Sequence, residues 1–321
     1  MKRIDFVNEL ATRLEIKRRD LIEKDIILHF VLHDLSRDKF FSANFVFKGG
    51  TCLIKCYYGY ARFSEDIDFT WRKQDNFEGK SQKKIREILS KTIDRTSSIF
   101  EKIAAERGFT FKTEKANRRF IELGGSDKSC TFKIWYQSEV LNRKSFFKVQ
   151  INFVEHLCFP FEKRSAKSLL SKPSDELDSL FPEFSQYAKA VSVFTYDIKD
   201  IVAEKVRALL TRRGTKARDF VDIYLIHKNY DLDPEDLEPC ISRKIELALG
   251  LYARFRTNLK EKIKLLNSNN FFEWGREREL LIREIDDREF YSYLRKLEEF
   301  LKRFVSSLSE KGSSNDQTPR L

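Results

Sequence analysis

One short block, residues 45–70, constrains the fold of this chain more than any other part of the sequence. It begins with an apolar run at Phe45, continues through Gly49-Gly50 into a helical pattern over residues 51–58, and ends with Ile67-Asp68-Phe69-Thr70. Apolar runs with aromatic and β-branched residues predict strands, and a glycine pair between a strand and a helix predicts a tight turn. The block therefore predicts strand, turn, helix and strand in close succession. It lacks a G-x-G-x-x-G motif, which argues against a Rossmann fold.

The rest of the chain separates into helical and strand-like parts. Helical patterns cover residues 1–40 and 80–106, and strand-like runs cover 109–111, 130–136 and 146–153. Residues 162–190 read as a connector with a short strand near 190–193, and from residue 198 the pattern is helical almost to the end. We therefore predict an α+β fold. Its parts are N-terminal helices (1–40), a mixed-sheet domain flanked by helices (41–194), an α-helical domain (195–306) and a disordered tail (307–321).

Composition narrows the class of protein. The chain has 321 residues, of which 41% are hydrophobic and 13% aromatic, which is enough apolar surface for a core and excludes a disordered chain. Its net charge of +11 is consistent with an anionic partner or simply with a lysine-rich surface. No secretory signal and no long apolar run is visible, so we expect a cytoplasmic protein without a membrane partner. Five irregularly spaced cysteines predict no disulfide framework.

Two carboxylates stand out in the second strand of the block. Residues two apart on a strand point to the same face, so Asp66 and Asp68 form a like-charge pair that favours a bound cation. Mg²⁺ or Mn²⁺ bound by such a pair would fill its remaining positions with water and phosphate oxygens. The alternative is a solvated loop end, which is common for two aspartates at this spacing.

The glycine pair strengthens the metal hypothesis. Gly49 and Gly50 follow a strand and open a helix, and Thr51 adds a hydroxyl at the helix start. Backbone N–H groups at such a turn can approach a phosphate closely. With Ser64 just before the carboxylates, these residues form a candidate nucleotide-binding turn beside a candidate metal site.

A second set of candidates lies in the helical half. Lys205 falls on the apolar stripe of a predicted helix, so its ammonium either reaches past the stripe to water or points into a polar cleft. Asp219 and Asp222 share a helical face, and Arg218 is spaced to pair with Asp222. From Lys199 to Arg218, seven basic and two acidic residues give a net charge of +5. This stretch, which includes Arg207, is a candidate triphosphate or RNA-backbone patch, or else a solvated basic loop.

Two segments together resemble a known family. FKGGTCLIKCYYGYARFSEDIDF and DIKDIVAEKVRALLTRRGTKARDFVDIYLI are similar to the corresponding blocks of the AbiEii/AbiGii toxin nucleotidyltransferases, in the same order. The resemblance implies a nucleotidyltransferase fold of the DNA-polymerase-β type and nucleotide transfer from an NTP to RNA, including tRNA 3′ ends. It also implies a growth-inhibiting role in phage defence, with an antitoxin that acts indirectly. It matches Asp66 and Asp68 to the family's metal-binding carboxylates, and Gly49, Gly50 and Thr51 to its phosphate turn. It also matches Lys205, Asp219 and Asp222 to the lysine and aspartates of two helical segments of the family. We therefore expect catalysis by Asp66, Asp68, Lys205 and Asp219. The expected nucleotide-binding residues are Gly49, Gly50, Thr51, Ser64, Lys205, Arg207, Arg218 and Asp222.

One departure from the family pattern affects the mechanism. Nucleotidyltransferases of this fold commonly add a third carboxylate on a later strand, but the expected strand here offers Gln150 and Asn152, which are neutral. Glu155 is the nearest acid, and its odd number places it on the opposite face unless the strand bulges. Because of this departure, a non-catalytic nucleotide- or RNA-binding module remains an alternative to the enzyme. The third hypothesis is a protein-interaction or structural protein.

Overall fold

The chain forms two compact units. The computed structural model describes residues 2–77, 79–125, 128–170, 174–268 and 271–314. The first unit contains Met1–Glu155 and Pro160–Asp197, and the second contains His156–Phe159 and Ile198–Leu321. We call them the sheet unit and the helical unit, after their main elements.

The sheet unit is built on one mixed sheet with the strand order β3-β4-β5-β2-β1-β7-β6. β2 pairs antiparallel with β1 and parallel with β5, while β1 pairs parallel with β7. The two edges are antiparallel: β3 with β4, β4 with β5, and β6 with β7. The strands are β1 (Phe45–Lys48), β2 (Asp66–Trp71), β3 (Ile121–Gly124), β4 (Ser129–Ser138), β5 (Arg143–Asn152), β6 (Glu162–Ala166) and β7 (Val191–Thr195). The predicted α+β fold with a mixed sheet is confirmed.

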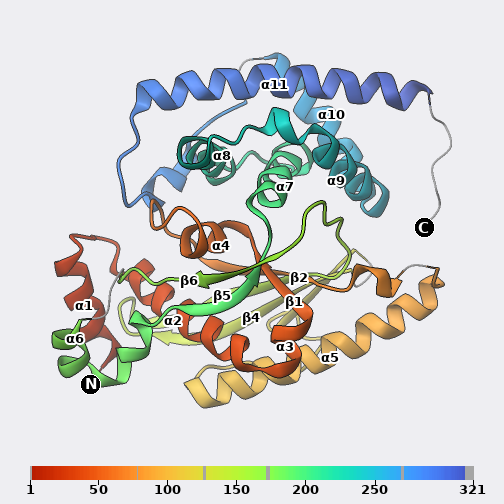
Figure 1. Cartoon of the computed structure of the whole chain (residues 1–321). Helices are drawn as coiled ribbons and strands as arrows, with labels where there is room; N and C mark the ends of the chain where they lie inside the picture. Colours follow the sequence, from red (N-terminus) through yellow and green to blue (C-terminus); the bar gives the residue numbers. More distant parts are fainter. Residues whose placement is uncertain (1, 78, 126–127, 171–173, 269–270, 315–321) are drawn as a thin grey trace. The chain divides into compact units, whose positions relative to one another are not determined.

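Helices cover the two faces of this sheet unequally. α3 and α5 lie on one face and the short helix α4 on the other (Figure 1). Phe41 of α3 stacks on Phe45 at 4.4 Å, and Phe100 of α5 meets Phe132 of β4 at 4.7 Å between ring centroids. This face is therefore the apolar core of the unit. The helices of the whole sheet unit are α1 (Arg3–Arg13), α2 (Arg19–Arg37), α3 (Lys39–Asn44), α4 (Gly49–Cys56), α5 (Gln82–Arg107) and α6 (Asp175–Leu180), with 3₁₀ turns at Gln74–Phe77 and Pro182–Ala188.

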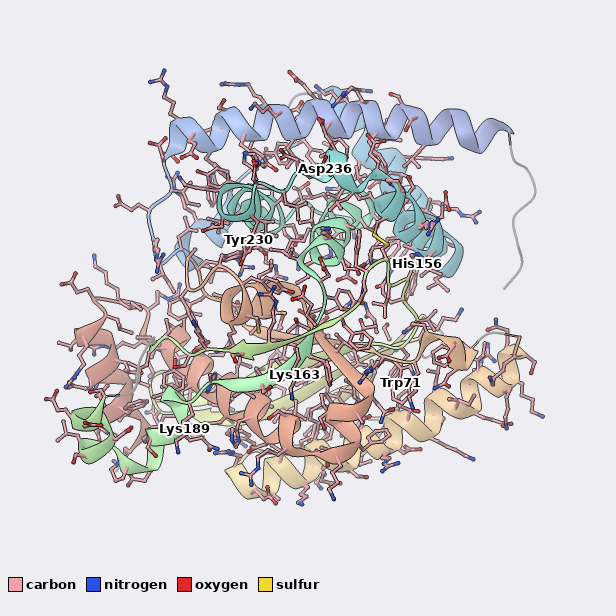
Figure 2. The ribbon with its side chains drawn as sticks, in the orientation of Figure 1. Trp71, His156, Lys163, Lys189, Tyr230 and Asp236 are labelled. Atoms are coloured by element: carbon pink, nitrogen blue, oxygen red, sulfur yellow. A yellow bond between two sulfur atoms is a disulfide. The ribbon has the colours of Figure 1, made fainter. Side chains whose placement is uncertain are left out.

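Several local expectations can be compared directly with these elements. The strand expected at residues 146–153 is present as β5, in which Phe147, Val149 and Ile151 alternate as buried residues. The strand expected at residues 109–111 is reduced to an isolated bridge between Thr110 and Trp135. β6, in the predicted connector, was missed because only Ala166 of its five residues is buried. Figure 2 labels Lys163, one of its exposed side chains.

The helical unit packs five α-helices with two 3₁₀ turns within its described residues. They are α7 (Ile198–Thr211), α8 (Ala217–Tyr230), α9 (Glu238–Leu251), α10 (Ala253–Asn267) and α11 (Asp287–Ser314), with 3₁₀ turns at Pro234–Leu237 and Gly275–Leu280. α11 continues past residue 307 into the segment predicted as a tail, since extending an existing helix is easier than starting one. Residues 315–321 of that segment lie outside the described residues.

The expectation of no disulfide is wrong at one place. Cys158 and Cys240 form a disulfide within the helical unit, across a sequence separation of 82 residues, while Cys52, Cys56 and Cys130 take part in no disulfide. Spacing along the chain could not reveal this pair, because packing brings the segment His156–Phe159 onto α9. None of the helices in the described residues is long and apolar enough to span a membrane.

Candidate active site

The two aspartates of β2 project from the sheet face opposite the apolar core. Ile67 and Phe69 are buried on the core side, so the strand period turns Asp66 and Asp68 to the other side. Asp66 lies in register with Lys148 of β5, and Asp68 with Gln150. The same-face arrangement that the sequence predicts for the carboxylates is therefore present.

The glycine turn that opens α4 lies directly against these side chains. Gly49 has a φ of +76°, a left-handed conformation, and a Cβ added to it would overlap Oδ2 of Asp68. A Cβ on Gly50 would lie 2.5 Å from Nη2 of Arg62 and 3.5 Å from Oγ of Ser64. Both positions thus require glycine, because the Asp68 carboxylate occupies the space of a Cβ at Gly49 and the Arg62 guanidinium occupies it at Gly50.

Thr51 and Ser64 hold the loop that leads into β2. The Thr51 hydroxyl donates to the carbonyl oxygen of Asp66 and lies 2.7 Å from Oγ of Ser64. Thr51 is also buried. These contacts tie the start of α4 to the start of β2, so they fix the separation between the glycine turn and the carboxylates.

The neighbouring strand supplies amides where a third carboxylate is common. Asn152 and Gln150 lie on the Asp68 side of β5, in register with Thr70 and Asp68. Glu155, expected on the opposite face, has its carboxylate near this side: it lies 3.6 Å from Nζ of Lys48, the register partner of Asp68, and accepts from Nδ2 of Asn152 at 3.5 Å. Its backbone N–H donates to the Gln74 side chain. The oxygen donors in register at this point of the sheet are therefore two carboxylates and the Gln150 amide.

These donors fit a hard divalent cation. Mg²⁺ and Mn²⁺ prefer carboxylate and amide oxygens, and a carboxylate seated in the space that Gly49 leaves open is held in one place. Asp66 and Asp68 would hold such an ion, with Gln150 able to add a neutral oxygen.

The helical unit brings together three of its predicted site residues. Nζ of Lys205 on α7 lies 2.6 Å from Oδ2 of Asp222 and 3.0 Å from Oδ1 of Asp219, both on α8. Arg212 adds a second cation, 2.7 Å from Asp219. Burial alone would raise the pKa of Asp219, but the charges of Lys205 and Arg212 outweigh it and hold that pKa below its usual range. The lysine predicted on an apolar stripe is therefore the centre of a buried ion-pair cluster.

The two remaining basic candidates have acidic partners nearby. Arg207 lies 3.7 Å from Glu204 on α7. Arg218 lies 3.8 Å from Glu277, and its backbone N–H donates to the same carboxylate. The i,i+4 spacing suggests Asp222 as the partner of Arg218, whereas the structure places Asp222 on Lys205.

Sequence reasoning missed Arg62 and Arg212. Arg62 is buried and donates to the carbonyl oxygen of Phe63 at 2.6 Å, which places its guanidinium at Gly50. An arginine between Ala61 and Phe63 carries no motif that would single it out. Arg212 was counted within the basic stretch, but its contact with Asp219 depends on how α7 packs against α8.

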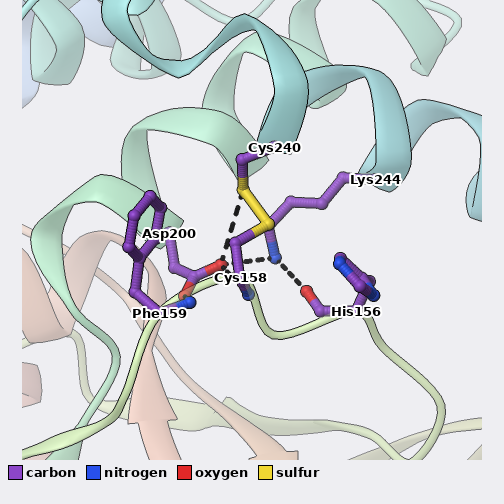
Figure 3. The surroundings of a disulfide bond; sticks show 6 residues. All are labelled: His156, Cys158, Phe159, Asp200, Cys240 and Lys244. Carbon is purple, nitrogen blue, oxygen red and sulfur yellow. Dashed lines mark hydrogen bonds and ion pairs between the residues drawn. A yellow bond between two sulfur atoms is a disulfide. The ribbon is translucent and has the colours of Figure 1, made fainter.

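Besides the Lys205 cluster, the helical unit contains a second group of side chains, and its composition resembles that of a metal site. Cys158, Asp200 and Cys240 offer ligand atoms within 4.8 Å of one another. However, the two sulfurs are joined, and Nζ of the buried Lys244 lies 2.9 Å from Oδ1 of Asp200 (Figure 3). Asp200 also accepts the backbone N–H groups of Cys158 and Phe159. An ammonium at this carboxylate opposes a second cation, so the cluster is an anchor for the segment His156–Phe159.

Comparison with known proteins gives one family and one fold. The sequence profile of the family described as nucleotidyl transferase AbiEii toxin, type IV TA system, matches residues 33–311. The nucleotidyltransferase toxin MenT4 from Mycobacterium tuberculosis shares the fold, with a TM-score of 0.57 and 18% identity over 95% of this chain and 90% of MenT4. JHP933 from Helicobacter pylori aligns over 90% of this chain and 97% of its own, at 16% identity and a TM-score of 0.38, too low to support an argument. Among curated proteins, none matches the sequence significantly.

Proposed function

This chain belongs to the AbiEii family of nucleotidyl transferase toxins of type IV toxin–antitoxin systems, and we propose that it transfers a nucleotide from an NTP to an RNA acceptor with the help of a divalent metal ion. The family resemblance expected from the two sequence blocks is confirmed, and with it the enzyme class, a nucleotidyltransferase. The observation that carries the finer proposal is the pair Asp66 and Asp68 on one strand face, with Asp68 against Gly49.

In the proposed reaction, an RNA hydroxyl attacks the α-phosphate of the NTP. A new phosphodiester bond forms, the hydroxyl loses its proton, and pyrophosphate leaves. Asp66 and Asp68 would hold Mg²⁺ or Mn²⁺, which when bound stabilises the negative charge of the triphosphate. The chain itself supplies positioning: Thr51 and Ser64 fix the loop, and the Gly49-Gly50 turn directs backbone N–H groups toward a phosphate.

For the helical unit, we propose that Lys205 neutralises charge on the nucleotide and that Asp219 and Asp222 orient its ammonium. The short distances from Lys205 to both carboxylates support a fixed orientation. Arg207 and Arg218 complete the proposed nucleotide-binding set, with charges that suit a triphosphate. The net charge of +11 also suits an RNA acceptor, for which the tRNA 3′ end is our first choice.

The biological setting follows from the family. A toxin of a type IV system has a cognate antitoxin, and we propose that the antitoxin acts indirectly, that the pair serves phage defence, and that the toxin works in the cytoplasm. The second candidate function is a nucleotide- or RNA-binding module without catalysis, favoured by the neutral Gln150 beside Asp68.

The experiment that tests this proposal is a transfer assay with each of the four labelled NTPs on a tRNA pool, in Mg²⁺ and in Mn²⁺. We expect Asp66→Asn and Asp68→Asn to fold normally and to lose transfer by at least about 100-fold, since each removes a charged metal ligand. The matched control is Asp75→Asn, an exposed aspartate of the following 3₁₀ turn, which should leave transfer unchanged. Full transfer by the Asp66 variant would refute the assignment, and nucleotide binding without any RNA product would favour the binding module.

A further inference from the structure

The outer face of β4 and β5 carries an aromatic pair beside the candidate active site. Trp135 of β4 and Phe146 of β5 are register partners, and their ring centroids lie 4.8 Å apart at an angle of 45°. Phe146 is 36% exposed. Both belong to the sheet face that carries Asp66 and Asp68, because Phe132, Ile134 and Phe147 occupy the core side. Trp135 is half-buried, so the pair is only partly covered, and an aromatic pair left partly open on a polar sheet face calls for a reason other than core packing.

The tryptophan ring is held in a defined orientation. Its Nε1–H donates to the carbonyl oxygen of Arg119 at 2.9 Å, and the Arg119 guanidinium carbon lies 5.2 Å from the ring centroid. The indole is therefore fixed before any ligand arrives, which lowers the entropy lost on binding.

The surroundings of the pair are basic. Lys144 and Lys148 flank Phe146 on the same face of β5, and Arg119 and Lys133 flank Trp135. Glu122 lies 2.6 Å from Lys133 and offsets one of these charges. We call Trp135, Phe146, Arg119, Lys144 and Lys148 the β4–β5 platform. It combines aromatic faces with cations, the combination that binds single-stranded nucleic acid through stacking and phosphate contacts.

Strand register connects this platform to the carboxylates. Lys148 lies opposite Asp66, and Phe146 precedes Lys148 by two residues on the same face of β5. Two residues of a strand span about 7 Å, close to the axial length of two stacked nucleotides. A strand of RNA that stacks on Phe146 would therefore have its end within reach of Asp66.

We propose that the β4–β5 platform binds the single-stranded 3′ end of the RNA acceptor. Bases stack on Phe146 and Trp135, while Lys144, Lys148 and Arg119 contact phosphates. Since stacking accepts every base, the platform selects an unpaired end rather than a sequence. The link between this binding and nucleotide transfer rests on the proposed function. The binding itself can be measured without NTP.

The test is fluorescence anisotropy of a labelled five-nucleotide RNA with the full chain, in the absence of NTP. We expect Phe146→Ala to weaken binding about tenfold, because it removes one stacking face. Phe146→Tyr should restore binding, and Phe146→Leu should not. The matched control is Leu123→Ala, an exposed apolar residue of β3 paired with Cys130 on the other sheet face. Lys148→Gln should lower the slope of log affinity against log salt by about one.

The outcomes separate this inference from the function on which it rests. Unchanged RNA binding in Phe146→Ala, equal losses in Phe146→Ala and Leu123→Ala, or no binding of the pentamer by the wild type would each overturn the platform. The same holds if transfer proceeds in Phe146→Ala with an unchanged KM for RNA. If the wild type binds RNA through Phe146 but forms no RNA product, the platform stands and the transfer proposal fails.

Discussion

At Gly49, the left-handed backbone and the carboxylate of Asp68 leave no room for a side chain. We predict that Gly49→Ala lowers the free energy of unfolding by about 2–4 kcal/mol, of which the left-handed conformation accounts for about 1–2 kcal/mol and the overlap for the rest. It should also reduce transfer strongly, since Asp68 must move. Urea unfolding and the transfer assay measure the two effects.

Gly59 offers a control at the same backbone conformation. Its φ is +82°, but a Cβ there would meet nothing within 4 Å. Gly59→Ala should therefore lose only the part of the unfolding free energy that comes from the left-handed backbone, about 1–2 kcal/mol, and should keep full transfer activity. Equal losses of stability and activity in the two variants would contradict the role given to the contact with Asp68.

A second prediction at this scale concerns pH and His29. Burial, together with the charge of Lys55, lowers the pKa of His29 to about 4, while its Nε2 lies 2.9 Å from the carbonyl oxygen of Lys189. The unfolded chain binds this proton near pH 6.5, so the contribution to stability is complete above pH 6.5 and falls as the pH drops toward 4. We predict that the wild type loses about 3 kcal/mol more over this range than His29→Gln, which does not titrate. Unfolding curves at several pH values measure the difference, and parallel pH profiles would rule out the prediction.

At the scale of elements, α7 and α8 are joined by the buried contacts of Lys205. Lys205→Met leaves Asp219 and Asp222 with fewer cations in a buried place, so we predict a loss of about 3–5 kcal/mol in the unfolding free energy. Lys228→Met is the control: its pair with Glu289 also starts from α8 but is about half exposed, and such pairs contribute about 0–1 kcal/mol. Chemical denaturation of both variants measures the two losses in unfolding free energy. Similar losses would mean that burial does not strengthen the Lys205 cluster.

The elements also show what the sequence could and could not predict. The positions of Asp66 and Asp68, and the buried alternation on β5, follow from a period of two along a strand. β6 escaped prediction because it is a polar edge strand, whose pairing with β7 depends on backbone hydrogen bonds more than on apolar side chains. In the same way, the contact of Lys205 with two carboxylates depends on helix packing that spacing along one helix does not encode.

For the whole molecule, the path of the chain is less simple than two halves in sequence order. The segment His156–Phe159 belongs to the helical unit although the residues on both sides belong to the sheet unit. Asp200 accepts two of its backbone N–H groups, Lys244 donates to the carbonyl oxygen of His156 at 2.5 Å, and a disulfide joins Cys158 to α9 (Figure 3). These contacts, and not the composition of the segment, determine the unit to which it belongs.

The last prediction concerns this disulfide. It closes a long loop, with a sequence separation of 82 residues, and a loop of that size restricts the unfolded chain enough to stabilise the helical unit by about 2–4 kcal/mol. We therefore expect a reducing agent to speed amide hydrogen exchange in peptides from α7 and α9, while peptides from β2 and β5 stay protected. Cys240→Ser should exchange like the reduced wild type with or without reductant, whereas Cys130→Ser, which removes a cysteine outside the disulfide, should keep the response. Identical exchange in oxidised and reduced wild type would show that Asp200 and Lys244 hold the segment without the covalent bond.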